Sequence, residues 1–174
     1  LNKKTQNFMF SGFEQKPIPV MLGDFSAPII LEQKRSIDEY ALILKSESNS
    51  FCIWESTQKI YLSILASIIE EKPLPIKIDA VLENIIAKNQ SDAGFLSKLL
   101  ELPSTEDLTV YMLKKENFVD PEKIHLAREK LERVMAQSFK DRLIGWYNSI
   151  IIDNRKFDQL NTGKRNLRNR YLDF

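Results

Sequence analysis

The chain has 174 residues, of which 43% are hydrophobic, and this content is enough for one well-buried domain or for one domain and part of another. Its 25 lysine and arginine residues nearly balance 24 acidic residues, and the net charge of +1 excludes an overall field that would select nucleic acid or an anionic membrane. Cys52 is the only cysteine, which excludes an intrachain disulfide framework, fits a reducing compartment and predicts a buried thiol on a helix face.

Residues 17–31, PIPVMLGDFSAPIIL, are predicted to be non-helical, because Pro17, Pro19 and Pro28 lack an amide donor and bias the preceding residue towards extended conformations. Residues 6–10 (QNFMF) and 28–32 (PIILE) have the aromatic and β-branched content of strands. Two strands alone are marginal in water. We therefore expect them to pack on helices or to complete a sheet whose other strands lie elsewhere.

Two capping boxes predict helix starts in the remainder of the chain. Ser36 with Glu39 predicts a helix that starts at residue 37 and runs to about residue 45. Ser104 and Asp107 are also three residues apart and predict a second such start. Between them, a second helix begins near Phe51, and its longest apolar run is shorter than the about 20 residues that a membrane span needs. The other helices predicted in this half cover residues 79–88 and 92–101.

Asp120 followed by Pro121 is the strongest helix start in the chain, since aspartate caps free amides and proline is pre-set for the first helical position. The helix that follows keeps an apolar period for about seven turns. Residues 154–160 are predicted to be a shorter helix or a loop, and Thr162 is predicted to cap the last helix.

Short helices joined by polar turns predict a mainly α fold, an irregular array of antiparallel helix pairs of the HEAT or armadillo kind, preceded by the one or two strands. The chain starts at Leu1 without methionine or signal sequence, and its last helix stops at Phe174 without a cap. We therefore expect both ends to be boundaries within a longer protein, with an apolar face exposed at the C-terminal one.

Histidine and cysteine, which would bind zinc or serve in a catalytic triad, are scarce, whereas paired carboxylates are abundant. A zinc site needs three or four ligands, whereas His125 and Cys52 are the only histidine and cysteine and lie on different predicted helices. The five glycines form no phosphate-binding loop. The carboxylate pairs at residues 70–71 and 106–107 lie at helix ends, where capping and solvation explain them. No catalytic residue and no metal ligand is therefore assigned.

The basic run KRNLRNR, residues 164–170, is the only local excess of charge. On a helix Arg165 and Asn169 share one face, and Arg168 lies about one turn from Arg165. A helix that binds nucleic acid looks similar, with an affinity that falls steeply as salt rises. Without a wider basic surface, a solvated or cavity-lining face is the preferred interpretation, and no nucleic-acid partner is expected.

Five segments occur in the order PIPVMLGDFSAPIIL, SNSFCIWESTQKIYLSIL, LLELPSTEDLTVYM, VDPEKIHLAREKLERVMAQSF and KRNLRNRYL. In this order they resemble the bacterial aminopeptidase N family of zinc metallopeptidases, most specifically in the first segment and in KRNLRN, and least over residues 76–97. The resemblance implies that residues 1–33 are the terminal strands of a small β-sandwich domain and a linker, and that residues 34–174 are the first part of a helical C-terminal domain.

The resemblance also implies a cytoplasmic parent enzyme that removes N-terminal amino acids from peptides, with zinc held by a His-Glu-x-x-His helix and a later glutamate. Neither this motif nor the family's Gly-x-Met-Glu-Asn loop occurs here, so the chain is expected to hold no cofactor and to be inactive alone. The helical domain is expected to close over the active site and to shape peptide access. Arg165, Arg168 and Asn169 are the substrate-channel candidates, for contact with the carboxylate of a peptide.

The expected partners are the upstream catalytic and β domains of the same polypeptide and, in the full protein, peptide substrates. No membrane partner is expected, and the protein is expected to be a monomer. The alternative is a free-standing helical-repeat module for protein interaction. In the family a further arginine often follows the LRN element, whereas this chain has Tyr171 to Phe174.

Overall fold

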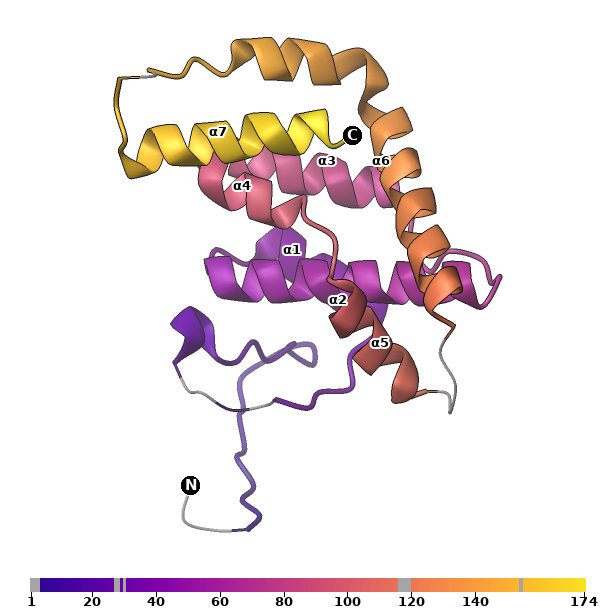
Figure 1. Ribbon diagram of the computed structural model, residues 1–174. Coiled ribbons are helices and arrows are strands. Elements are labelled where there is room, and N and C mark those ends of the chain that lie inside the picture. The colour runs from indigo at the N-terminus through magenta and orange to yellow at the C-terminus, as the bar shows by residue number, and fades with distance from the viewer. Residues whose placement is uncertain (1–3, 27–28, 30, 116–119, 154) are drawn as a thin grey trace.

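The computed structural model describes residues 4–26, 29, 31–115, 120–153 and 155–174, and Figure 1 shows a stack of helices with the N-terminal segment beside it. This part of the chain contains a short 3-10 helix and seven α-helices, so the predicted mainly α class is confirmed. The elements are η1 (Gly23–Phe25), α1 (Ile37–Ser46), α2 (Ser50–Ile69), α3 (Ile78–Asn89), α4 (Ala93–Leu99), α5 (Thr105–Leu113), α6 (Pro121–Ser149) and α7 (Gln159–Leu172).

Both predicted capping boxes are present. Ser36 Oγ accepts the backbone N–H of Glu39 at 3.2 Å, and the Glu39 carboxylate accepts the backbone N–H of Ser36 at 2.8 Å. Ser104 and Asp107 exchange the same two hydrogen bonds at the start of α5, at 3.0 and 3.3 Å. These bonds satisfy amides that the first turn of a helix leaves free, which is why the sequence pattern located both starts closely.

Aspartates cap the last two helices. Asp120 precedes Pro121 at the start of α6, as predicted. The prediction that Thr162 caps α7 is wrong, because Asp158 is the N-cap and its carboxylate accepts the N–H of Asn161 at 2.7 Å. Thr162 lies in the first turn, where its hydroxyl donates to the Asp158 carbonyl at 2.8 Å. A carboxylate also interacts favourably with the helix N-terminus, and its hydrogen bonds from Asn161 lower the pKa of Asp158.

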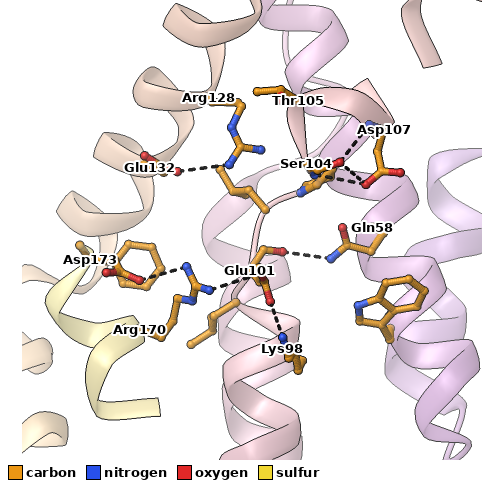
Figure 2. A pocket seen from close by; sticks show the side chains of 15 residues that line it. Gln58, Lys98, Glu101, Ser104, Thr105, Asp107, Arg128, Glu132, Arg170 and Asp173 are labelled. Carbon is orange, nitrogen blue, oxygen red and sulfur yellow. Dashed lines mark hydrogen bonds and ion pairs between the residues drawn. The ribbon is translucent and has the colours of Figure 1, made fainter. Parts of the chain in front are cut away.

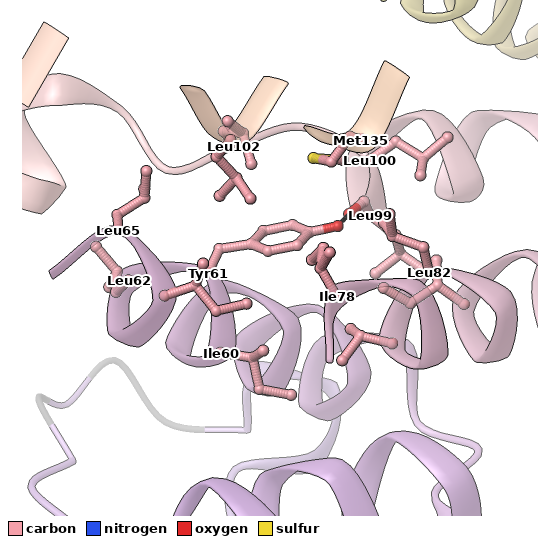
Figure 3. Packing of buried hydrophobic residues seen from close by; sticks show 14 of the residues in the cluster. Ile60, Tyr61, Leu62, Leu65, Ile78, Leu82, Leu99, Leu100, Leu102 and Met135 are labelled. Carbon is pink, nitrogen blue, oxygen red and sulfur yellow. Dashed lines mark hydrogen bonds between the residues drawn. The ribbon is translucent and has the colours of Figure 1, made fainter. Parts of the chain in front are cut away.

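Helix α2 is the centre of the packing and contacts η1, α1, α4, α5 and α6. Its residues Ile60, Tyr61, Ile64 and Leu65 are completely buried. Figure 3 shows the Tyr61 ring among leucine, isoleucine and methionine side chains of the core. Its hydroxyl donates to the carbonyl of Leu99 at 3.1 Å, so the polar end of the ring is satisfied inside the core.

Helix α7 lies against α4 (Figure 1), and glycines from both helices meet at their contact. A Cβ atom added to Gly163 would lie 2.9 Å from the backbone nitrogen of Gly94. The two backbones therefore touch without an intervening side chain. This contact positions α7, and with it the basic run of residues 164–170.

The N-terminal segment has a different character. Apart from η1, residues 4–26 form no helix or strand, and the side chains of Phe8, Met9 and Phe10 are exposed. The strand predicted over residues 6–10 has no partner strand among the described residues, and the one over residues 28–32 includes Pro28 and Ile30, which lie outside them. Both strands, and a domain boundary near residue 33, stay predictions.

Polar contacts attach this segment to the start of α2. Asn49 caps α2 by accepting the N–H of Cys52 at 3.2 Å, and its amide also donates to the Asp24 carboxylate at 2.7 Å. The backbone passes through the left-handed region at Leu22 and Asp24, with φ of 60° and 54°. Cys52 is buried beneath this turn, as predicted, and its thiol is 3.7 Å from the Met21 carbonyl.

Candidate functional site

A charged cleft lies where α2, α6, α7 and the connection between α4 and α5 meet (Figure 2). Its volume is about 840 Å³, within the size range of small-molecule sites. The apolar part of its lining consists of Trp54, Leu100, Leu102, Pro103 and Phe174, and the polar part of Gln58, Lys98, Glu101, Ser104, Thr105, Asp107, Arg128, Glu132, Arg170 and Asp173.

Two arginines enter this cleft from different helices. Arg128 of α6 is 22% exposed, and its Nη2 lies 3.8 Å from the Glu132 carboxylate one turn further on. Arg170 of α7 is 27% exposed and lies between two carboxylates, with Nη2 3.7 Å from Glu101 and Nη1 3.1 Å from Asp173. Figure 2 shows that basic and acidic side chains alternate along the cleft wall.

Hydrogen bonds hold the connection between α4 and α5 in place. Gln58 of α2 donates its side-chain amide to the Glu101 carbonyl at 3.0 Å, and Lys98 donates to the Glu101 carboxylate at 3.0 Å. Ser104 Oγ donates to the Asp107 carboxylate at 2.6 Å within the capping box. This serine and aspartate therefore serve the start of α5, and they are not interpreted as a nucleophile and its base.

The interior next to the cleft is strongly desolvated. Burial raises the pKa of Tyr61 above its ordinary value, and the positive charge of Arg170 acts in the opposite direction. Burial also raises the pKa of Tyr171, on α7, to about 12. Charges that line the edge of such an interior interact more strongly than charges in open solvent. The charged side chains of the cleft therefore lie beside a desolvated interior.

The three predicted channel residues lie on α7 but do not line this cleft. The Arg165 guanidinium is 5.5 Å from the ring of Phe157, and it donates to the Thr162 hydroxyl at 3.3 Å. Arg168 lies 4.2 Å from the ring of Tyr147. Asn169 is exposed. Among the described residues the Arg168 Nε is buried and has no hydrogen-bond partner.

The single histidine and the single cysteine are separated. His125 lies on α6 with its side chain 70% exposed and its Nε2 3.4 Å from the Glu129 carboxylate, whereas Cys52 is buried on α2. In the described part of the chain, no three histidine, cysteine, aspartate or glutamate side chains are grouped so that they could hold a metal ion. The described helices also include none that is long and apolar enough to cross a membrane.

Sequence reasoning missed Arg128 and treated Arg170 only as part of the basic run. Arg128 is followed by Glu129 and Glu132, which gave it the pattern of an ordinary solvated helix face. The residues that line the cleft are distant in sequence, from Trp54 to Phe174, and no local sequence motif predicts that they lie together. The only local signal was the position of residues 128 and 170 beside buried apolar positions of their helices.

Comparison with known proteins finds relatives whose similarity extends over nearly the whole chain. Aminopeptidase N of Escherichia coli is 27% identical over 179 residues, a match that covers 97% of this chain and 20% of the relative. Aminopeptidase N of Haemophilus influenzae is 26% identical over 182 residues, covering 100% of this chain and 20% of the relative. The chain therefore spans about 20% of the length of these curated relatives.

A crystal structure of Legionella pneumophila aminopeptidase A in complex with aspartic acid has the same fold over 86% of this chain and 18% of its own, with a TM-score of 0.69 and 20% sequence identity. The resemblance to aminopeptidase N is confirmed by these matches, and so is the array of armadillo type. A family model described as a domain of unknown function (DUF3458_C) with ARM repeats matches residues 37–174, and the chain belongs to that family.

Proposed function

We propose that this chain forms the first part of the helical C-terminal domain of a cytoplasmic zinc aminopeptidase that removes N-terminal amino acids from peptides. The observation that carries the proposal is the similarity to two aminopeptidase N proteins along the whole chain, over about 20% of their length. The role of the chain is non-catalytic: it closes over the active site of the catalytic domain upstream and shapes the access of peptides to it.

The exposed apolar side chains of the N-terminal segment support this arrangement. Phe8 is 65% exposed and Met9 is 97% exposed, and neither packs on the helices. Large apolar side chains that are exposed together mark surfaces that another element covers. A β domain upstream in the same polypeptide would bury them.

Sequencing the gene upstream of the codon for Leu1 tests the proposal. We expect an open reading frame that continues upstream and encodes a His-Glu-x-x-His helix, since the zinc and the base of the reaction must come from that part of the polypeptide. An initiation codon immediately before Leu1 would contradict the proposal. It would favour a free-standing module for protein interaction.

The role of Arg165, Arg168 and Asn169 in the substrate channel is a separate element of this proposal. In the full-length enzyme we expect Arg165→Gln to raise KM about tenfold for a tripeptide with a free carboxylate, and to leave KM unchanged for the same tripeptide as its amide. Arg155→Gln is the matched control, because Arg155 is 93% exposed and lies outside the run. Equal changes for both tripeptides would contradict a carboxylate contact.

A further inference from the structure

A second pocket lies between the N-terminal segment and the helices α1, α2 and α5. Its volume is about 790 Å³, and it shares no lining residue with the charged cleft. Two contacts hold the segment beside it, since Arg35 donates to the Pro19 carbonyl and the Cys52 thiol lies 3.7 Å from the Met21 carbonyl. The segment therefore forms one wall of this pocket, and the three helices form the other.

Ser56 of α2 brings a buried hydroxyl group to the pocket. The residue is 3% exposed and lines the pocket, and its hydroxyl forms no hydrogen bond with the described residues. The hydroxyl of the next residue, Thr57, by contrast donates to the Ile53 carbonyl at 2.8 Å. Buried hydroxyl groups are normally hydrogen-bonded, so we expect Ser56 to bond to a polar atom that enters the pocket.

The charges around the pocket favour an anion. Four basic and two acidic side chains give its lining a net charge of +2, namely Lys34, Arg35, Lys59, Lys114, Glu32 and Glu55. Among the described residues Lys59 forms no ion pair, although Glu55 lies one helical turn before it. The ammonium group of this half-buried lysine is therefore available to a ligand.

Arg35 approaches the same part of the pocket from the start of α1. Its guanidinium lies 6.0 Å from the centre of the Tyr40 ring, and both residues line the pocket. Burial raises the pKa of Tyr40, and the charges of Arg35 and Glu55 act on it in opposite directions. Such interactions weaken with distance, so Arg35, Tyr40 and Glu55 lie near one another, and Lys59 is one turn beyond Glu55.

The pocket has an apolar end and a cationic end. Met21 contacts Cys52 at the start of α2, and Ile43 lines the pocket from the last turn of α1, next to that start. Ser56 and Lys59 lie one and two turns further along α2. A rise of 1.5 Å per residue places the backbone of Lys59 about 10 Å beyond that of Cys52. A ligand that spans this distance meets both ends.

We propose that this pocket binds a small phosphate monoester that carries an apolar group. The phosphate accepts hydrogen bonds from Ser56, Lys59 and Arg35, and the apolar group extends towards Met21. A phosphate monoester carries a charge of about −1.5 to −2 at pH 7, which nearly neutralises the lining, whereas a carboxylate neutralises only half of it. This site requires neither zinc nor another domain, so it goes beyond the proposed function and is independent of it.

Equilibrium dialysis of the 174-residue chain against hexyl phosphate tests the proposal. We expect saturable binding at a single site. Inorganic phosphate lacks the apolar group and hexanoate carries a single charge, so each is expected to bind at least about tenfold more weakly than hexyl phosphate. No saturable binding at millimolar concentrations would overturn the proposal. Binding of hexanoate or of inorganic phosphate as tight as that of hexyl phosphate would overturn it too.

Two variants identify the residues that hold the phosphate. Lys59→Gln and Ser56→Ala are each expected to weaken the binding of hexyl phosphate, by about tenfold for the charged side chain and by less for the hydroxyl. Lys123→Gln is the matched control, because Lys123 is exposed on α6 and lies outside the pocket. Ser56→Ala removes a hydroxyl that forms no hydrogen bond, so it is expected to fold, which circular dichroism checks for each variant. Unchanged binding in either variant, or an equal loss in the control, would overturn the proposal.

Discussion

The N-terminal segment and the helical array differ in what holds them in place. The array is built around α2, whose residues Ile60, Ile64 and Leu65 are completely buried. The segment leaves Phe8 and Met9 exposed, and its contacts with the array include the hydrogen bond between Asp24 and Asn49. The array therefore obtains its stability from its own core, whereas the described contacts of the segment lie at the start of α2 and at Arg35, which donates to the Pro19 carbonyl.

Truncation of a side chain in each region should show the largest difference in their contributions to stability. Leu65→Ala leaves a cavity in a completely buried site and is expected to lower the free energy of unfolding by about 2–5 kcal/mol. Met9→Ala, in a side chain that is 97% exposed, is expected to change it by less than about 0.5 kcal/mol. Urea denaturation followed by circular dichroism measures both. Similar losses for the two variants would contradict the difference between the regions.

A second test concerns the contact between α4 and α7. The new Cβ atom in Gly163→Ala would lie 2.9 Å from Gly94, so we expect a loss of about 1–3 kcal/mol in the free energy of unfolding. Gly145 of α6 has no atom near the position of a new Cβ, and Gly145→Ala is expected to stabilise the chain by about 0.5–1 kcal/mol. Thermal unfolding of both variants distinguishes them. Stabilisation by both would mean that the backbones do not meet.

Alkaline pH should weaken the array through its buried tyrosines. Burial raises the pKa of Tyr171 from 10.0 to about 12, so the folded state retains a proton that the unfolded state loses. The contribution of this proton to the free energy of unfolding is fully present below pH 10. It is lost as the pH rises from 10 to 12, by about 1.4 kcal/mol per pH unit for each such tyrosine. We expect Tyr171→Phe to reduce this dependence, as measured by urea denaturation at pH 8 and pH 11. An unchanged dependence would show that Tyr171 does not contribute to it.

The smallest effect should come from the attachment of the N-terminal segment. Asn49→Ala removes the cap of α2 and the contact with Asp24, and we expect a loss of about 1 kcal/mol in the free energy of unfolding together with faster proteolysis within residues 14–26. Asn49→Asp keeps a capping oxygen and removes the amide that donates to Asp24. It is expected to accelerate proteolysis with less effect on α2. Unchanged proteolysis in both variants would show that Asn49 does not hold the segment.

The helix starts were predictable because their causes are local. Ser36 with Glu39, and Asp120 with Pro121, carry the whole explanation within a few residues. The cap of α7 was mispredicted because Asp158 and Thr162 both have capping side chains, and only their hydrogen bonds distinguish them. The helical class followed from helix length and polar turns.

The cleft was not predictable, since it depends on how distant helices cross. Arg128 and Arg170 are brought to one cleft by the packing of α6 and α7, while Arg165 and Arg168, in the same basic run as Arg170, turn towards aromatic rings instead. The position of α7 depends on the meeting of Gly94 and Gly163, which has no sequence signature. The residues of the cleft could therefore not be predicted, because the sequence does not show how these helices pack against one another.

The measurement that tests most directly whether this array is a non-catalytic part of an aminopeptidase is an assay of the isolated 174-residue chain with leucine p-nitroanilide and added zinc. We expect no turnover, because the described residues hold no cluster of metal ligands and the sequence contains no His-Glu-x-x-His motif. Zinc-dependent turnover that a chelator abolishes would contradict this conclusion.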